Sequence, residues 1–143
     1  MQGEQRRQPR PTGRGLLGDL WPALAIAALI FVLSSLPLRA PQAAPGWSDT
    51  AAHMTLFGAL CVALRWAWLR RRWALAALGP VALTVCYGVL DEAHQAFVPG
   101  RSPDWRDVAA DGVGALVALL LTVRTGRMGA GGARRKAPGR FPA

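Results

Sequence analysis

The sequence has 143 residues, a length typical of one domain, and it is both apolar and strongly basic. Hydrophobic residues make up 52% of it, the mean hydropathy is +0.21 and the formal net charge is +9. A basic, soluble nucleic-acid-binding protein interleaves its arginines with an amphipathic pattern, whereas here the arginines are segregated from the apolar runs. Apolar runs bordered by basic segments are typical of membrane proteins. We therefore predict an integral membrane protein with no nucleic-acid partner.

Four apolar stretches are candidates for membrane spans, each of which needs about 20 mostly apolar residues. The first three run over about 16–36, over about 49–69, and from 73 to at least 90. The fourth is strictly apolar only between 112 and 123, so it must begin earlier to span. Ser102-Pro103-Asp104 predicts such a beginning, with Ser102 as N-cap and Pro103 at the first helical position. A helix from Pro103 to Val123 is about 31 Å long, and the sequence thus predicts an all-α bundle of four transmembrane helices.

The basic residues predict how this bundle is oriented. With the N-terminus in the cytoplasm, 14 of the 17 arginines and lysines lie inside and three lie outside. Because cytoplasmic loops carry an excess of these residues, we predict that both termini are cytoplasmic. The predicted organisation is a basic tail over 1–15, a transmembrane domain over 16–123 and a disordered basic tail over 124–143. The first apolar run is longer than a signal-peptide core, so we interpret it as a retained span.

Ionisable residues gather at the predicted extracytoplasmic ends of the spans. Six of the eight acids and both histidines lie there. A spacing of four residues places Asp49 and His53 on one helix face, and Asp107 and Asp111 on another. A charge in the apolar zone is costly and normally points into the bundle. We therefore predict one shared, outward-facing polar site made of Asp49, His53, Glu92, Gln95, Arg101, Asp107 and Asp111.

The same residues form an ordered set of motifs. These are an Asp with a His four residues later, Glu-x-x-Gln, Phe-x-Pro-Gly-Arg, and an Asp followed four residues later by Asp and then by Gly. In this chain they are Asp49 and His53, Glu92 and Gln95, Phe97 with Pro99, Gly100 and Arg101, then Asp107, Asp111 and Gly114. The set resembles the VanZ-like family of small bacterial membrane proteins, over about residues 31–121. One departure is Thr50, where that family commonly has Lys.

The resemblance implies a multi-pass protein of the bacterial cytoplasmic (inner) membrane with a role in the cell envelope. The family is named for a protein linked to low-level resistance to the glycopeptide teicoplanin. The resemblance supplies no mechanism, so the function must be argued from the site.

Three hypotheses follow for the predicted site. In the preferred one it binds a polar lipid head group, an envelope precursor or a glycopeptide, with Arg101 as the anchor of an anionic group. In the second, the acids and His53 hold a metal ion in a membrane-embedded hydrolase or transferase that acts on a lipid or envelope substrate. In the third, the charges only pair helix ends, with Arg101 bridging Glu92 to Asp107 and His53 bonding Asp49. The preferred hypothesis assigns no catalytic residue, no cofactor and no metal.

Small residues recur at every fourth position of the fourth predicted span. Ala110, Gly114 and Ala118 form a stripe that is typical of close helix packing in membranes. We interpret the stripe as a surface for close helix packing. A homo-oligomer through the same stripe is the alternative, and it would be needed for a transport pathway, since four short helices leave little room for one. The other predicted partners are membrane lipids and the envelope precursor or glycopeptide named above.

Overall fold

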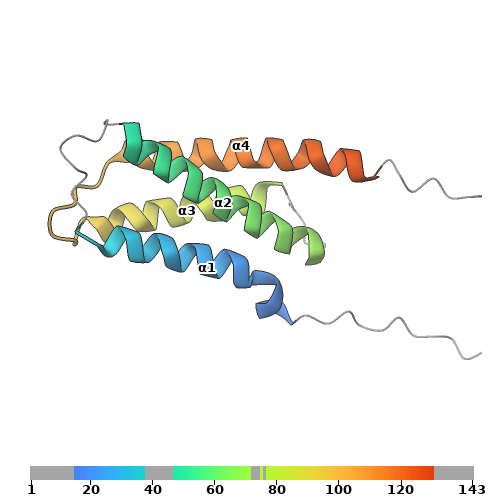
Figure 1. Cartoon of the computed structure of the whole chain (residues 1–143), viewed down its shortest axis with the longest axis horizontal. Coiled ribbons are helices and arrows are strands. Elements are labelled where there is room, and N and C mark those ends of the chain that lie inside the picture. The colour runs from blue at the N-terminus through green and yellow to red at the C-terminus, as the bar shows by residue number, and fades with distance from the viewer. Residues whose placement is uncertain (1–14, 38–46, 72–74, 76, 131–143) are drawn as a thin grey trace, which may run out of the picture.

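The computed structural model describes residues 15–37, 47–71, 75 and 77–130, and this part of the chain consists of four α-helices without a strand (Figure 1). The helices are α1 (Leu16–Ser35), α2 (Trp47–Arg71), α3 (Leu78–Gln95) and α4 (Trp105–Ala130). Helix α2 contacts the other three, and α3 contacts both α1 and α4. The beginning of α1 and the end of α4 lie at the same end of the bundle (Figure 1). The predicted all-α fold is confirmed.

The distribution of apolar and polar side chains reverses the pattern of a soluble protein. Leu90 and Leu120 are 65% and 63% exposed, whereas Thr84 and Asp111 are fully buried. Helices that face lipid keep their polar groups inside the bundle, where other protein groups can satisfy them. Within the described residues, two helices, Leu16–Ser35 and Trp47–Arg70, are long and apolar enough to cross a membrane. They coincide with the first two predicted spans.

A small apolar core joins α1 to α2 and positions the end of α1. Ile30 and Phe57 are almost completely buried in it, and Tyr87 of α3 packs against it. The Tyr87 hydroxyl also donates a hydrogen bond of 2.7 Å to the carbonyl oxygen of Ala27. These contacts hold the last turn of α1, with Ser34, beside the last turns of α3.

Helix α3 begins later than its apolar run predicts, and its end agrees with the prediction that it reaches at least Leu90. Leu75 has a φ of 56°, a left-handed conformation that an α-helix cannot contain, and α3 begins after it at Leu78. The helix then continues beyond Leu90 to Gln95. The acidic residues 91 and 92 are therefore part of a regular helix, and their side chains have fixed directions.

Helix α4 begins two residues later than predicted. The N-cap is Asp104, whose Oδ1 accepts a hydrogen bond of 2.9 Å from the backbone N–H of Arg106, so the prediction of Ser102 in this role was wrong. At its other end α4 extends to Ala130, beyond the predicted boundary at Val123. Residues 131–143 of the predicted tail, and 1–14 of the N-terminal tail, lie outside the described residues.

Candidate functional site

His53 of α2 contacts two acids of α4. Its Nδ1 lies 3.1 Å from Oδ1 of Asp111, and its Nε2 lies 4.0 Å from Oδ2 of Asp107. The two acids are four residues apart on α4 and therefore share the face that packs on α2. The imidazole ring also stacks on Phe57, one turn along α2, with 5.7 Å between the ring centroids. Packing on one side and hydrogen bonding on the other leave His53 little freedom to rotate.

The last two turns of α3 contribute a second group of buried polar side chains. Oδ2 of Asp91 accepts hydrogen bonds from Ser34 Oγ of α1, at 2.8 Å, and from Gln95 Nε2, at 2.9 Å. Oε2 of Glu92 accepts a hydrogen bond of 2.7 Å from the backbone N–H of Asp104, just before α4. Each carboxylate is thus fixed by a different neighbouring element.

These two groups meet at one end of the bundle. His53, Asp91 and Glu92 each offer a ligand atom, and the three atoms lie within 4.8 Å of one another. Two buried carboxylate oxygens, Oε1 of Glu92 and Oδ2 of Asp111, have no hydrogen-bond partner in the part of the chain that the structure describes. We call His53, Asp91, Glu92, Asp107 and Asp111 the acidic cluster.

Glycines allow the helices that carry the acidic cluster to approach closely. A Cβ on Gly88 of α3 would lie 2.5 Å from Oδ2 of Asp111. A Cβ on Gly114 of α4 would overlap the backbone of Met54, whose Cα would lie 2.9 Å away. Only glycine leaves room at these two places, so the sequence permits α2, α3 and α4 to bring their polar residues together.

A family model described as VanZ/LLP1 matches residues 20–125, which is most of the chain. The chain belongs to the VanZ/LLP1 family. With two helices able to cross a bilayer, it is a VanZ-like membrane protein, as its motifs predicted. No match was found among curated proteins or among solved structures.

In this VanZ/LLP1 protein, five of the seven predicted site residues lie together at one end of the bundle. His53, Asp107 and Asp111 are in contact, Glu92 lies within 4.8 Å of the His53 ligand atom, and Gln95 is linked to the cluster through residue 91. Three separate segments of the chain thus supply one polar assembly.

The remaining two predicted site residues have other surroundings. Asp49 is exposed in the first turn of α2, and His53 bonds Asp111 rather than Asp49 as one hypothesis expected. Arg101 donates from Nη2 to the carbonyl oxygen of Leu33 at 3.0 Å and from Nε to that of Leu36 at 3.4 Å. Its guanidinium satisfies the open carbonyls at the end of α1, and the expected bridge to the acids of α3 and α4 is replaced by this cap.

Two members of the assembly were not among the predicted site residues. Asp91 is 4% exposed and Ser34 is 6% exposed, and the hydrogen bond between them joins residues 57 positions apart. A signal for Asp91 was present, because it lies four residues before Gln95 on the same helix face. Ser34 carried no comparable signal, since its role depends on how α1 packs against α3.

The small-residue stripe of α4 packs within the chain. Ala110, Gly114 and Ala118 are all buried, and Gly58 of α2 lies against the last two of them. The stripe therefore forms the contact between α2 and α4. A homo-oligomer stays a prediction.

The arrangement favours a ligand with positive charge or with N–H and O–H donors. Four carboxylates surround one histidine, and the nearby guanidinium of Arg101 is directed at carbonyl oxygens of α1. Charges buried in this way strongly favour a partner of opposite sign, because desolvation is otherwise uncompensated. The guanidinium of Arg101 lies against the end of α1, and its role as an anionic anchor stays a prediction.

Proposed function

We propose that this VanZ/LLP1 protein spans the bacterial cytoplasmic membrane four times, with both termini in the cytoplasm and the acidic cluster facing outward. The excess of basic residues at the tails and between the second and third spans supports this orientation. The beginning of α1 and the end of α4 lie at the same end of the bundle, which agrees with both termini on one side of the membrane (Figure 1). The acidic cluster then lies at the outer leaflet, where it can meet molecules of the cell envelope.

In this position the cluster binds the polar part of an amphiphilic envelope molecule. Candidates are a lipid head group, an envelope precursor, and a glycopeptide such as teicoplanin, the last of which would connect the protein to resistance. The observation that carries the proposal is the pair of buried carboxylate oxygens, Glu92 Oε1 and Asp111 Oδ2, that lack a partner among the described residues. An unsatisfied buried acceptor costs about 1–3 kcal/mol or more, and a ligand that donates hydrogen bonds to it removes that cost.

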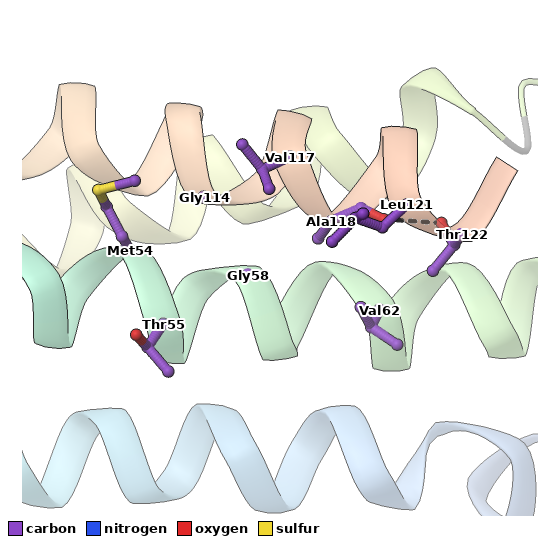
Figure 2. Close-up of a pocket in the computed structure, with 9 residues that line it drawn as sticks. All are labelled: Met54, Thr55, Gly58, Val62, Gly114, Val117, Ala118, Leu121 and Thr122. Carbon is purple, nitrogen blue, oxygen red and sulfur yellow. Dashed lines mark hydrogen bonds between the residues drawn. The ribbon is translucent and has the colours of Figure 1, made fainter. Parts of the chain in front are cut away.

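An apolar groove beside the cluster supports an amphiphilic ligand. Met54 directly follows His53 and lies at one end of a groove of about 320 Å³ between α2 and α4 (Figure 2). Its other walls include Gly58, Val117 and Leu121, so that it follows the helices away from the polar residues. A ligand with its polar part at His53 could place a hydrocarbon tail along this groove, where the tail would bury apolar surface.

The proposal is tested by native mass spectrometry of the full chain in detergent, with two lipids that share tails but differ in head group. Phosphatidylethanolamine, which carries an ammonium group, is expected to bind at least tenfold more tightly than phosphatidylglycerol. Teicoplanin is compared in the same way with a glycopeptide that lacks a lipid tail. Asp111→Asn is expected to reduce the preference for the ammonium lipid.

Asp19→Asn is the matched control, because Asp19 is also a buried acid but pairs with Arg70 near the opposite end of α1. It is expected to keep wild-type selectivity. Equal binding of both lipids and of both glycopeptides by the wild type would contradict the proposal. The hypothesis that the charges only pair helix ends would then be favoured.

A further inference from the structure

The three ligand atoms of His53, Asp91 and Glu92 are arranged almost as closely as those around a bound metal ion. They lie within 4.8 Å of one another. In an octahedral site with bonds of about 2.1 Å, opposite ligand atoms are about 4.2 Å apart. Three atoms within 4.8 Å of one another lie at most about 2.8 Å from a common centre, so shifts of up to about 0.7 Å would bring all three into contact with one ion.

Glu92 independently favours a cationic partner. The residue is 7% exposed, one of its oxygens accepts the backbone N–H of Asp104, and the other, Oε1, is buried without a hydrogen-bond partner among the described residues. A buried carboxylate that binds through only one oxygen is costly. A metal ion at the cluster would use the free oxygen.

Asp111 holds His53 as a supporting carboxylate holds a metal-bound histidine. Its Oδ1 lies 3.1 Å from Nδ1, and the acid itself is fully buried. A neutral His53 that donates its Nδ1 hydrogen to Asp111 keeps the Nε2 lone pair for a cation, the common arrangement in metal sites. Asp91 is held similarly, because Ser34 and Gln95 both donate to its Oδ2.

We infer that His53, Asp91 and Glu92 bind one divalent metal ion, with Asp111 as a positioning residue. One imidazole and two carboxylates favour a first-row metal such as Mn²⁺ or Zn²⁺ over Mg²⁺ and Ca²⁺, which prefer oxygen ligands alone. The inference rests on the proposed function for the outward-facing position of the cluster, and it names a metal ion as a cationic group that the carboxylates bind. Metal binding itself is measurable without any envelope ligand.

The test uses the full chain in detergent, without an affinity tag, after treatment with a chelator. MnCl₂ is titrated while the electron paramagnetic resonance signal of free Mn²⁺ is followed, and bound Zn²⁺ is counted by elemental analysis after desalting. We expect one ion per chain, unaffected by a tenfold excess of Mg²⁺. Pulsed resonance of the Mn²⁺ complex should detect a coupled ¹⁴N nucleus from the imidazole of His53.

Conservative variants assign the ligands. Glu92→Gln and His53→Gln should each weaken Mn²⁺ binding at least tenfold, and His53→Gln should also remove the ¹⁴N coupling. Asp111→Asn should weaken binding by about 10-fold to 100-fold and retain that coupling, as expected of a residue that orients a ligand. Asp19→Asn should still bind one ion, and circular dichroism reports whether each variant keeps its helices.

The outcomes separate this inference from the proposed function. Absence of bound Mn²⁺ and Zn²⁺ in the wild type, or binding that survives both Glu92→Gln and His53→Gln, would overturn the metal site. If the ammonium lipid is still preferred in that case, the proposed function stands without a metal. One ion per chain without lipid or glycopeptide selectivity would support the metal site and contradict the proposed ligand.

Discussion

Buried acids have different surroundings at the two ends of the bundle. Near the beginning of α1, Asp19 is paired with Arg70 of α2, with 2.9 Å between Oδ1 and Nε. The guanidinium of Arg70 also lies over the ring of Trp66, 4.9 Å from its centroid. At the other end, the acidic cluster has four carboxylates, one histidine and two buried oxygens without a partner among the described residues.

This difference separates a structural ion pair from a candidate site. The Asp19–Arg70 pair joins α1 to α2, and its charge is balanced within the chain. The acidic cluster gathers like charges and leaves acceptors unsatisfied, which costs stability. Retained unfavourable polar arrangements are typical of functional sites, where activity is favoured at the expense of stability.

The largest expected effect comes from forcing α2 and α4 apart. The acidic cluster depends on the close contact of these two helices, whereas the Asp19–Arg70 pair does not. In Gly114→Ala the new Cβ would overlap the backbone of Met54, and a backbone clash cannot be relieved by a rotamer change. We expect a loss of about 3 kcal/mol in the free energy of unfolding. Thermal unfolding in detergent measures it, as a midpoint lowered by roughly 10 °C.

Gly112→Ala is the control for this substitution, because it lies on the same helix and its Cβ would meet only Val85 Cγ2, at 3.7 Å. It should change stability by less than about 1 kcal/mol, and replacing a helical glycine by alanine can even stabilise. Equal losses for Gly114→Ala and Gly112→Ala would mean that the close crossing is not required.

The next effect concerns the paired end. Asp19→Asn removes the charge that balances Arg70, and we expect a loss of about 1 kcal/mol because the guanidinium is partly solvated. Arg70→Gln should cost a similar amount. The two losses should not add in the double variant, since both remove one interaction. If the decrease in the thermal unfolding midpoint of the double variant equals the sum of the two single decreases, the ion pair contributes nothing by itself.

The sequence predicted the helices better than their ends, for a physical reason. The apolar runs show which segments lie in an apolar environment, so the existence of the four helices was predictable. A helix ends where its backbone hydrogen bonds end, and in α3 these continue through the polar residues to Gln95. The beginning of α3 depends on the left-handed conformation of Leu75, which no residue preference would suggest.

The candidate site was predictable to the extent that it depends on helix faces. A spacing of four residues correctly grouped Asp107 with Asp111. The same spacing suggested that His53 bonds Asp49, yet a shared face does not determine which helix packs against that face. Here α4 packs there, and Asp111 becomes the partner of His53. The role of Arg101 was missed because it depends on carbonyl groups at the end of α1.

A smaller effect is expected at Arg101, which caps the end of α1 beside the acidic cluster. Arg101→Lys keeps the positive charge but cannot donate along two directions to the carbonyls of Leu33 and Leu36. We expect a loss of about 0.5 kcal/mol, the size of a helix C-terminal charge interaction. Lipid selectivity should stay at the wild-type level, and a tenfold loss of ligand affinity would return Arg101 to the binding site.

The smallest expected effect is the most informative about the acidic cluster. Glu92→Gln and Asp107→Asn keep the shape of each side chain and remove one negative charge. If the acids repel one another, each substitution relieves part of that repulsion. The amide oxygen introduced by Glu92→Gln can still accept the hydrogen bond from the backbone N–H of Asp104. We expect the free energy of unfolding to stay within about 0.5 kcal/mol or to rise, in contrast to the loss for Asp19→Asn.

Thermal unfolding of these two variants, in the presence of chelator, measures the cluster without a bound cation. If each variant loses about 1 kcal/mol or more in the free energy of unfolding, the acidic cluster has the same role as the Asp19–Arg70 pair, which is to stabilise the packing of the helix ends. Addition of Mn²⁺ then sharpens the comparison. It should raise the midpoint of the wild type and of Asp19→Asn, since an ion that binds only the folded chain stabilises it, and it should leave Glu92→Gln unchanged.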